Sequence, residues 1–137
     1  MNKIISYLLV VFWCAVIFWL SSKPGLAIAS GTLDFVTRKP AHIFVYFVLS
    51  ILSFRALIFD YKIKKALILA FGFSLLYAIS DEIHQILVPL REGKVLDIIF
   101  DATGAALAAI IIWRLQPLVV TRLLLLEASL QANMKKG

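Results

Sequence analysis

Most acidic side chains of this chain are gathered in one short stretch that also carries a histidine and a glutamine. Five of the eight Asp and Glu residues fall between positions 81 and 101. Asp81, His84 and Gln85, spaced i, i+3 and i+4, share one face if the stretch is helical. Imidazole titrates near neutrality, and a neighbouring carboxylate orients it and stabilises its charged form. The stretch is therefore suited to general acid–base catalysis.

Further polar residues lie before this stretch and within it, and several of them are cations. Guanidinium and ammonium groups neutralise phosphate, and arginine grips it with two parallel hydrogen bonds. The candidate phosphate-binding residues are Arg38, Lys39, Tyr46, Gln85 and Arg91. The candidate catalytic residues are His42, Asp81, Glu82, His84 and Asp101.

The same carboxylates also suggest binding of a divalent cation. Hard oxygen ligands suit Mg²⁺, Mn²⁺ or Ca²⁺. The candidate ligands, together with a histidine, are Asp81, Glu82, Asp97 and Asp101.

Simpler roles compete with these assignments. Asp97 can cap a helix, because the helix dipole favours an aspartate in the first turn, and the basic residues can be flanks whose charged ends extend to the membrane surface.

The composition of the whole chain is that of a membrane protein. Hydrophobic residues make up 62% of the 137 residues and charged residues 16%, and the mean hydropathy is +0.96. A carboxylate inside a membrane is costly, so one that persists there usually has a function. The net charge of +6 does not indicate nucleic-acid binding, because the basic residues lie between apolar runs rather than along one stripe.

Four apolar runs are long enough to cross a hydrocarbon layer about 30 Å thick. They cover about residues 4–20, 41–59, 66–88 and 95–113. Pro40 suits the first turn of the second helix, and Pro89 ends the third. Ala27-Ile28-Ala29 resembles a signal-peptide cleavage site, but the first run is longer than usual for such a peptide, so we expect it to be retained. The predicted fold is an all-α integral membrane four-helix bundle with antiparallel helices.

The distribution of Lys and Arg predicts the orientation in the membrane. With the N-terminus inside, nine of these residues face the cytoplasm and five face outward, which is the favoured arrangement. We therefore expect a multi-pass protein with both termini in the cytoplasm and the polar site on the outer side. The C-terminal segment, residues 115–137, is apolar but interrupted by Arg122 and Glu127. This pattern predicts an interfacial helix on the inner leaflet or a segment that contacts a partner.

Antiparallel packing would bring the polar groups to one level of the membrane. His42 lies near the outer end of the second span, and Asp101 lies near the outer end of the fourth. Asp81 precedes Pro89 by eight residues, roughly 12 Å of helix. The N-termini of the second and fourth helices would add partial positive charge at this level, which suits phosphate. The small residues Gly104, Ala105, Ala108 and Ala109 predict a close helix contact.

These motifs resemble those of the VanZ-like membrane family. The matching residues are Ser21, Ser22, Lys39-x-x-His42-x-x-x-Tyr46, Ser80-Asp81-Glu82-x-His84-Gln85, Arg91 and Asp97-x-x-x-Asp101-x-x-Gly104. The resemblance covers about residues 20–108 and implies one VanZ-like transmembrane domain over residues 1–137. It also implies a link with low-level resistance to the glycopeptide teicoplanin. Some relatives by fold, phosphatidylserine synthases among them, act on lipid head groups, which implies similar chemistry here.

Three functional hypotheses follow. The first is an enzyme that acts on a lipid-linked phosphate, head group or cell-envelope precursor at the outer face. The second is a non-catalytic factor that binds lipid head groups or cell-wall precursors. The third, a small transporter, is least favoured because the deeper halves of the helices carry no charged relay. The expected partners are membrane lipids or a lipid-linked cell-wall precursor, and not nucleic acid.

Overall fold

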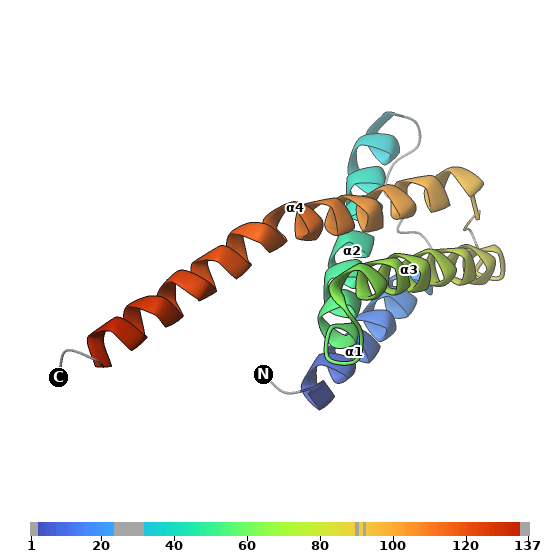
Figure 1. Cartoon of the computed structure of the whole chain (residues 1–137). Coiled ribbons are helices and arrows are strands. Elements are labelled where there is room, and N and C mark those ends of the chain that lie inside the picture. The colour runs from blue at the N-terminus through green and yellow to red at the C-terminus, as the bar shows by residue number, and fades with distance from the viewer. Residues whose placement is uncertain (1–2, 24–31, 90, 92, 135–137) are drawn as a thin grey trace.

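The computed structural model describes residues 3–23, 32–89, 91 and 93–134, and within these the side chains of residues 3–23, 38–89, 91 and 93–117. The described residues form four helices and no strand, as Figure 1 shows, which confirms the all-α fold. The helices are α1 (Lys3–Ser21), α2 (Thr32–Leu57), α3 (Ile63–Ile86) and α4 (Val95–Met134). Each contains a stretch long and apolar enough to cross a membrane, so the four predicted spans are confirmed by length and composition.

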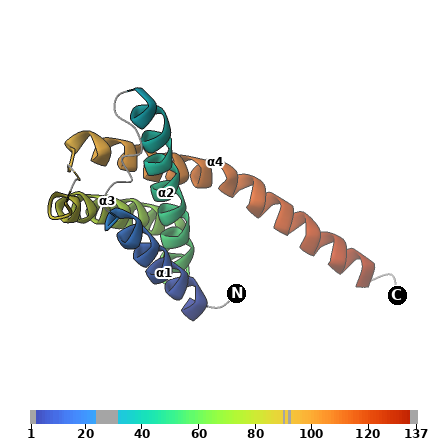
Figure 2. The ribbon, with the colours of Figure 1, turned by 180° about the vertical axis from the view of Figure 1, so that it is seen from behind.

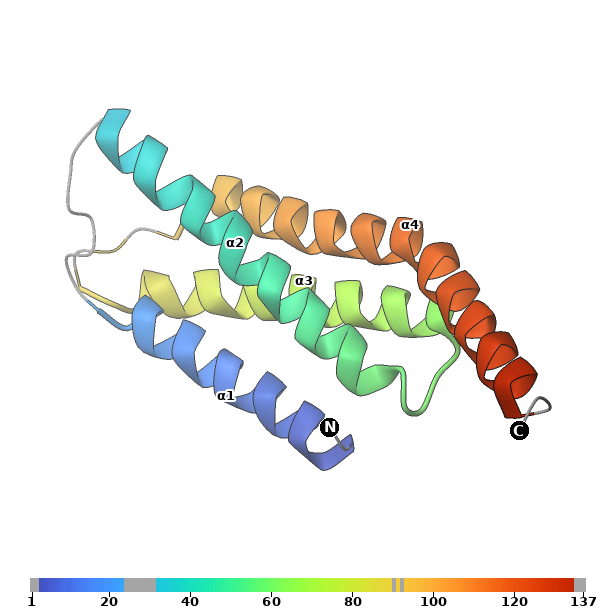
Figure 3. The same ribbon diagram turned by 90° about the vertical axis from the view of Figure 1, so that its left-hand side faces the viewer.

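Consecutive helices run in opposite directions. At one end of the bundle, Asp60 follows α2 and accepts hydrogen bonds from Lys3 (2.5 Å) and Tyr7 (2.8 Å) of α1. The hydrogen bond from Lys3 lowers the pKa of Asp60, so this carboxylate is charged at neutral pH. At the opposite end, Ser22 after α1 lies 3.0 Å from His84 in the last turn of α3. These contacts fix the antiparallel order, which can be followed in Figure 3.

Helices α2 and α4 approach each other more closely than side chains normally allow. A Cβ atom added to Gly104 of α4 would lie 2.1 Å from the backbone oxygen of Ile43 in α2. Ala105 and Ala108 beside it are fully buried, and Ser50 donates a hydrogen bond of 3.3 Å to the Ala105 carbonyl. The predicted small-residue contact is therefore confirmed, and it sets the spacing of the polar residues on these two helices.

The prediction that Pro40 lies in the first turn of the second helix is wrong. Helix α2 begins at Thr32 and contains Pro40 in its interior, although its apolar spanning part begins at Arg38. A proline removes a single backbone hydrogen bond, and membrane helices tolerate that loss, so the first-turn preference did not set the start of this helix. Its N-terminus lies roughly 15 Å of helix before His42, too far for its dipole to act there. The N-terminus of α4, with Asp97 in its first turn, does lie where it was expected.

The fourth helix extends well past its predicted span. It continues through Pro117 to Met134 without a break, and its C-terminal part projects away from the other three helices in Figures 1 and 2. The segment expected at the inner interface is thus helical over residues 115–134, and its position at a membrane surface stays a prediction. The sequence that resembles a cleavage site, residues 27–29, lies outside the described residues.

Candidate functional site

A cavity of about 270 Å³ lies among the first three helices, near the C-terminal ends of α1 and α3. The polar residues that line it are Ser21, Arg38, His42, Tyr46, Asp81, Gln85 and Arg91. Apolar side chains of Ile17, Leu20 and Val45 complete much of its wall. The structure thus brings most of the residues singled out by the sequence to one place, from three helices and the segment between α3 and α4.

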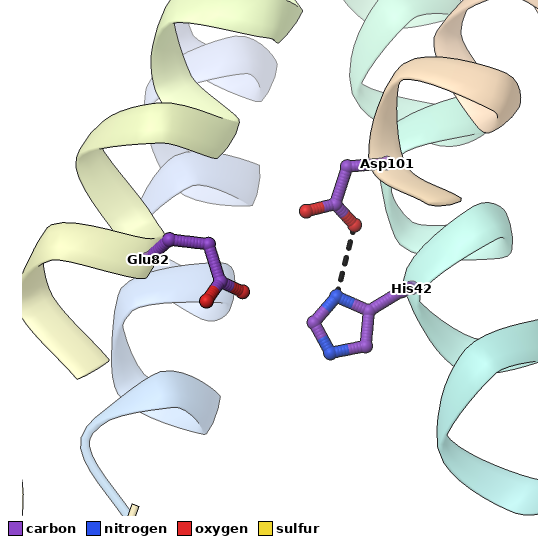
Figure 4. A group of neighbouring side chains, drawn as sticks. All are labelled: His42, Glu82 and Asp101. Atoms are coloured by element: carbon purple, nitrogen blue, oxygen red, sulfur yellow. Dashed lines mark hydrogen bonds and ion pairs between the residues drawn. The ribbon is translucent and has the colours of Figure 1, made fainter. Parts of the chain in front are cut away.

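His42 forms the link between this cavity and a pair of buried carboxylates. Its Nδ1 atom lies 2.9 Å from Oδ1 of Asp101 on α4. Glu82 of α3 faces these two residues from the other side, as Figure 4 shows. One ligand-type atom from each of the three residues lies within 4.8 Å of the others. Glu82 and Asp101 are 4% and 0% exposed, so both carboxylates are withdrawn from solvent.

The backbone before α4 holds Glu82 in place. The Lys94 amide donates a hydrogen bond of 2.7 Å to Oε2 of Glu82. Gly93 makes this approach possible, because a Cβ atom at that position would lie 2.7 Å from the Glu82 carbonyl oxygen and 2.6 Å from a side-chain carbon of Ile86. This support cannot be predicted from the sequence, since main-chain donors leave no signal in residue type.

Asp97 lies apart from this group and joins α4 to α2. Its two carboxylate oxygens bind Lys39 and, at 3.2 Å, Arg38, and Asp97 itself is fully buried. The Lys39 ammonium also lies 5.3 Å from the ring centre of Phe100. Of the four carboxylates proposed as metal ligands, Asp97 is therefore the one whose oxygens are both engaged by cations. Asp97 also lies in the first turn of α4, where the helix dipole favours a negative charge.

Asp81, Gln85 and Arg91 form a chain of hydrogen bonds along the cavity. Gln85 donates to Asp81 (2.9 Å), and Arg91 donates to Gln85 (3.2 Å). Arg91 also donates to the carbonyl of Leu20 (3.0 Å), in the last turn of α1, and to that of Lys23 (3.1 Å), just after this helix. Burial lowers the pKa of the Arg91 guanidinium, but a guanidinium remains charged at neutral pH. Arg91 therefore holds the end of α1 and keeps a positive charge on the cavity wall.

His84 points to a different neighbourhood from its helix partners Asp81 and Gln85. Its ring stacks on Phe18 of α1 with centroids 4.4 Å apart, and its Nε2 atom lies 3.0 Å from the Ser22 hydroxyl. His84 is not among the residues that line the cavity. The i, i+3 spacing with Asp81 leaves enough angular offset for the two side chains to meet different partners.

The family of the chain can be recognised from its sequence as a whole. The sequence pattern described as VanZ/LLP1 matches residues 4–118. The chain belongs to this family. The match includes every residue of the cavity and both buried carboxylates of this VanZ-like protein, and it confirms the resemblance drawn from the motifs. No curated protein and no solved structure matches the chain.

Proposed function

We propose that this VanZ-like protein is a membrane enzyme that hydrolyses or transfers the phosphate-linked head group of a lipid or of a lipid-linked cell-envelope precursor. The observation that carries the proposal is the pairing of His42 with Asp101 on the wall of the cavity. A carboxylate that accepts the Nδ1 proton fixes the tautomer of the ring and leaves Nε2 free to accept a proton. This is the arrangement that a general base requires.

The residues around His42 suit a phosphate group. In a hydrolytic step, the oxygen of a water molecule attacks phosphorus, its proton passes to His42, and the bond from phosphorus to the departing oxygen breaks. The imidazolium then returns the proton to that oxygen. Arg38 and Arg91 line the same cavity and would stabilise the additional negative charge of the transition state.

The nature of the cavity wall favours a lipid over a soluble phosphate. The wall combines cations with the apolar side chains Ile17, Leu20 and Val45. Tyr46 is also part of this wall and is 1% exposed, and its buried hydroxyl has no hydrogen-bond partner among the described residues. A head group bound beside it would supply that partner, since buried hydroxyl groups are normally hydrogen-bonded.

A test of the proposal uses the purified full-length chain in lipid nanodiscs, supplied with a total lipid extract from a bacterial envelope. Wild-type protein is expected to release or exchange head groups, detected by mass spectrometry of the lipids. Asp101→Asn should lower this turnover by about 10²–10⁴-fold, because an amide no longer fixes the histidine tautomer. Asp60→Asn, which removes an exposed carboxylate at the opposite end of the bundle, serves as the matched control. Equal turnover in wild type and Asp101→Asn would contradict the proposed chemistry.

A non-catalytic binder of head groups is the second candidate, and Arg91 favours it. Three protein acceptors already hold its guanidinium, so the remaining N–H groups are preorganised for an anion. In the same assay, such a protein would leave every lipid unchanged. It would instead retain one lipid class after purification, and Asp101→Asn would weaken this retention modestly. Teicoplanin resistance in cells would be compatible with either activity.

We also propose that the cavity opens toward the outer side of the membrane, with both termini in the cytoplasm. The nine-to-five distribution of Lys and Arg supports this orientation. Reporter fusions placed after Phe59 and after Lys136 are expected to report a cytoplasmic location. A signal from the outer side at either position would overturn this topology, and a signal from the outer side at both would place the cavity at the inner face.

A further inference from the structure

We infer that His42, Glu82 and Asp101 bind one divalent transition-metal cation. The three side chains come from α2, α3 and α4 and converge from separate directions in Figure 4. One nitrogen or oxygen of each lies within 4.8 Å of the other two. Three ligand atoms spaced evenly around an ion with bonds of about 2.1 Å lie at most about 3.6 Å apart, so each of the three residues needs to move inward by less than about an ångström.

Each of the two carboxylates keeps one buried oxygen without a partner. The Lys94 amide occupies Oε2 of Glu82, while Oε1 has no hydrogen bond among the described residues. In the same way His42 occupies Oδ1 of Asp101, while Oδ2 has none. Buried oxygens of this kind are costly unless a proton, water or ion satisfies them. Two of them beside one imidazole therefore point to a common ligand.

The distribution of charge supports a cation rather than a neutral ligand. Asp97 binds both Lys39 and Arg38, and Asp81 accepts a hydrogen bond from Gln85. Within the described part of the chain, Glu82 and Asp101 have no ion pair with any Lys or Arg side chain. Two neighbouring buried carboxylates repel each other unless a positive charge or a shared proton lies between them. A divalent cation neutralises both at once.

The donor set favours some metals over others. One imidazole with two carboxylates suits Mn²⁺, Fe²⁺, Co²⁺ or Zn²⁺ better than Mg²⁺ or Ca²⁺, which prefer oxygen ligands alone. Three ligands from the protein leave coordination positions open to water or to a phosphate oxygen, as in catalytic metal sites. This last step rests on the proposed function. With the ion bound, His42 would be a ligand in place of the general base described above, and Asp81 on the cavity wall would take over as the proton acceptor.

The experiment measures metal binding directly, without an activity assay. Full-length protein in nanodiscs is stripped with EDTA, dialysed and titrated with Mn²⁺, whose free concentration is followed by electron paramagnetic resonance. We expect one Mn²⁺ ion per chain, and we expect Glu82→Gln and Asp101→Asn each to weaken binding at least tenfold. Asp60→Asn is the matched control, because it removes a carboxylate far from the cluster, and it should bind as wild type does.

A second measurement uses the wild-type protein, so that the test remains valid even if the variants do not fold. The chain has only two histidines, so ¹⁵N labelling of histidine reports on few nuclei. Pulsed electron paramagnetic resonance of the Mn²⁺ complex should show one directly bound histidine nitrogen, and His84→Gln should leave this coupling in place. Absence of the nitrogen coupling, or equal binding by wild type, Glu82→Gln and Asp101→Asn, would overturn the inference. A shared proton or a bound water molecule would then account for the two oxygens.

The outcomes also separate this inference from the proposed function. Stoichiometric Mn²⁺ binding without any change in head groups supports the metal site and contradicts the enzyme. Turnover that persists in EDTA, in protein that binds no Mn²⁺, supports the enzyme and contradicts the metal site.

Discussion

Replacing Gly104 by alanine is expected to disrupt the packing of α2 against α4, although it adds only one methyl group. That methyl carbon would lie 2.1 Å from the Ile43 carbonyl oxygen and 2.9 Å from its carbon. Both are backbone atoms, so no side-chain rotation relieves the clash, and the helices must separate. Overpacking of a core commonly lowers the free energy of unfolding by about 1–3 kcal/mol. Because the clash here is with rigid backbone, we expect a loss at or above the upper end of that range.

The consequences of this change extend to the site. Asp101 lies one turn before Gly104, and its partner His42 directly precedes Ile43. Separation of the helices would therefore lengthen the contact between His42 and Asp101, as well as the ion pairs of Asp97. We expect Gly104→Ala to unfold at a clearly lower temperature in detergent and to lose the function of the site.

Gly72→Ala is the matched control for this prediction. Gly72 lies inside α3, and a Cβ atom there would meet nothing within 4 Å. Alanine is favoured over glycine in a helix by about 0.5–1 kcal/mol, so this variant should be neutral or slightly more stable. Thermal unfolding of both variants, followed by size-exclusion chromatography or tryptophan fluorescence, distinguishes the two cases. The same unfolding temperature for both would show that α2 and α4 are not in backbone contact at Gly104.

The fold was predictable because a bilayer imposes a simple rule on sequence. Apolar runs of sufficient length must become helices, since every backbone polar group needs a partner within the segment. Short connections then force neighbouring helices to be antiparallel. The antiparallel order alone places His42, Asp81 and Asp101 at one depth in the membrane, without any knowledge of how the helices pack. The sequence therefore predicts that these residues form a cluster, but not which side chains contact each other.

Other features depended on packing that a sequence does not display. The start of α2 depends on whether the helix tolerates Pro40 in its interior. The preference of proline for the first turn of a helix placed this start too late in the sequence. The direction of His84 depends on the position of Phe18 on α1, and the placement of the Glu82 carboxylate depends on the Lys94 amide. The last two are contacts between elements, while helical periodicity describes only one element at a time.

The two histidines provide the sharpest test of the site, because the sequence makes them equal candidates and the structure does not. His42 lines the cavity and pairs with a buried carboxylate, whereas His84 stacks on Phe18 and contacts Ser22. The same substitution at both positions gives a matched pair of variants. His42→Gln removes a group that accepts a proton or binds the ion, so head-group turnover should fall by about 10²–10⁴-fold.

His84→Gln is expected to behave differently in the same assay. It removes one hydrogen bond and one ring contact, worth about 1 kcal/mol each, so turnover should stay within roughly tenfold of wild type. Both variants are compared at equal amounts of folded protein in nanodiscs, with thermal unfolding as the check on stability. If His84→Gln lost turnover as completely as His42→Gln, the ring against Phe18 would have to swing toward the cavity in the working state. The division between a reactive and a packing histidine would then be wrong.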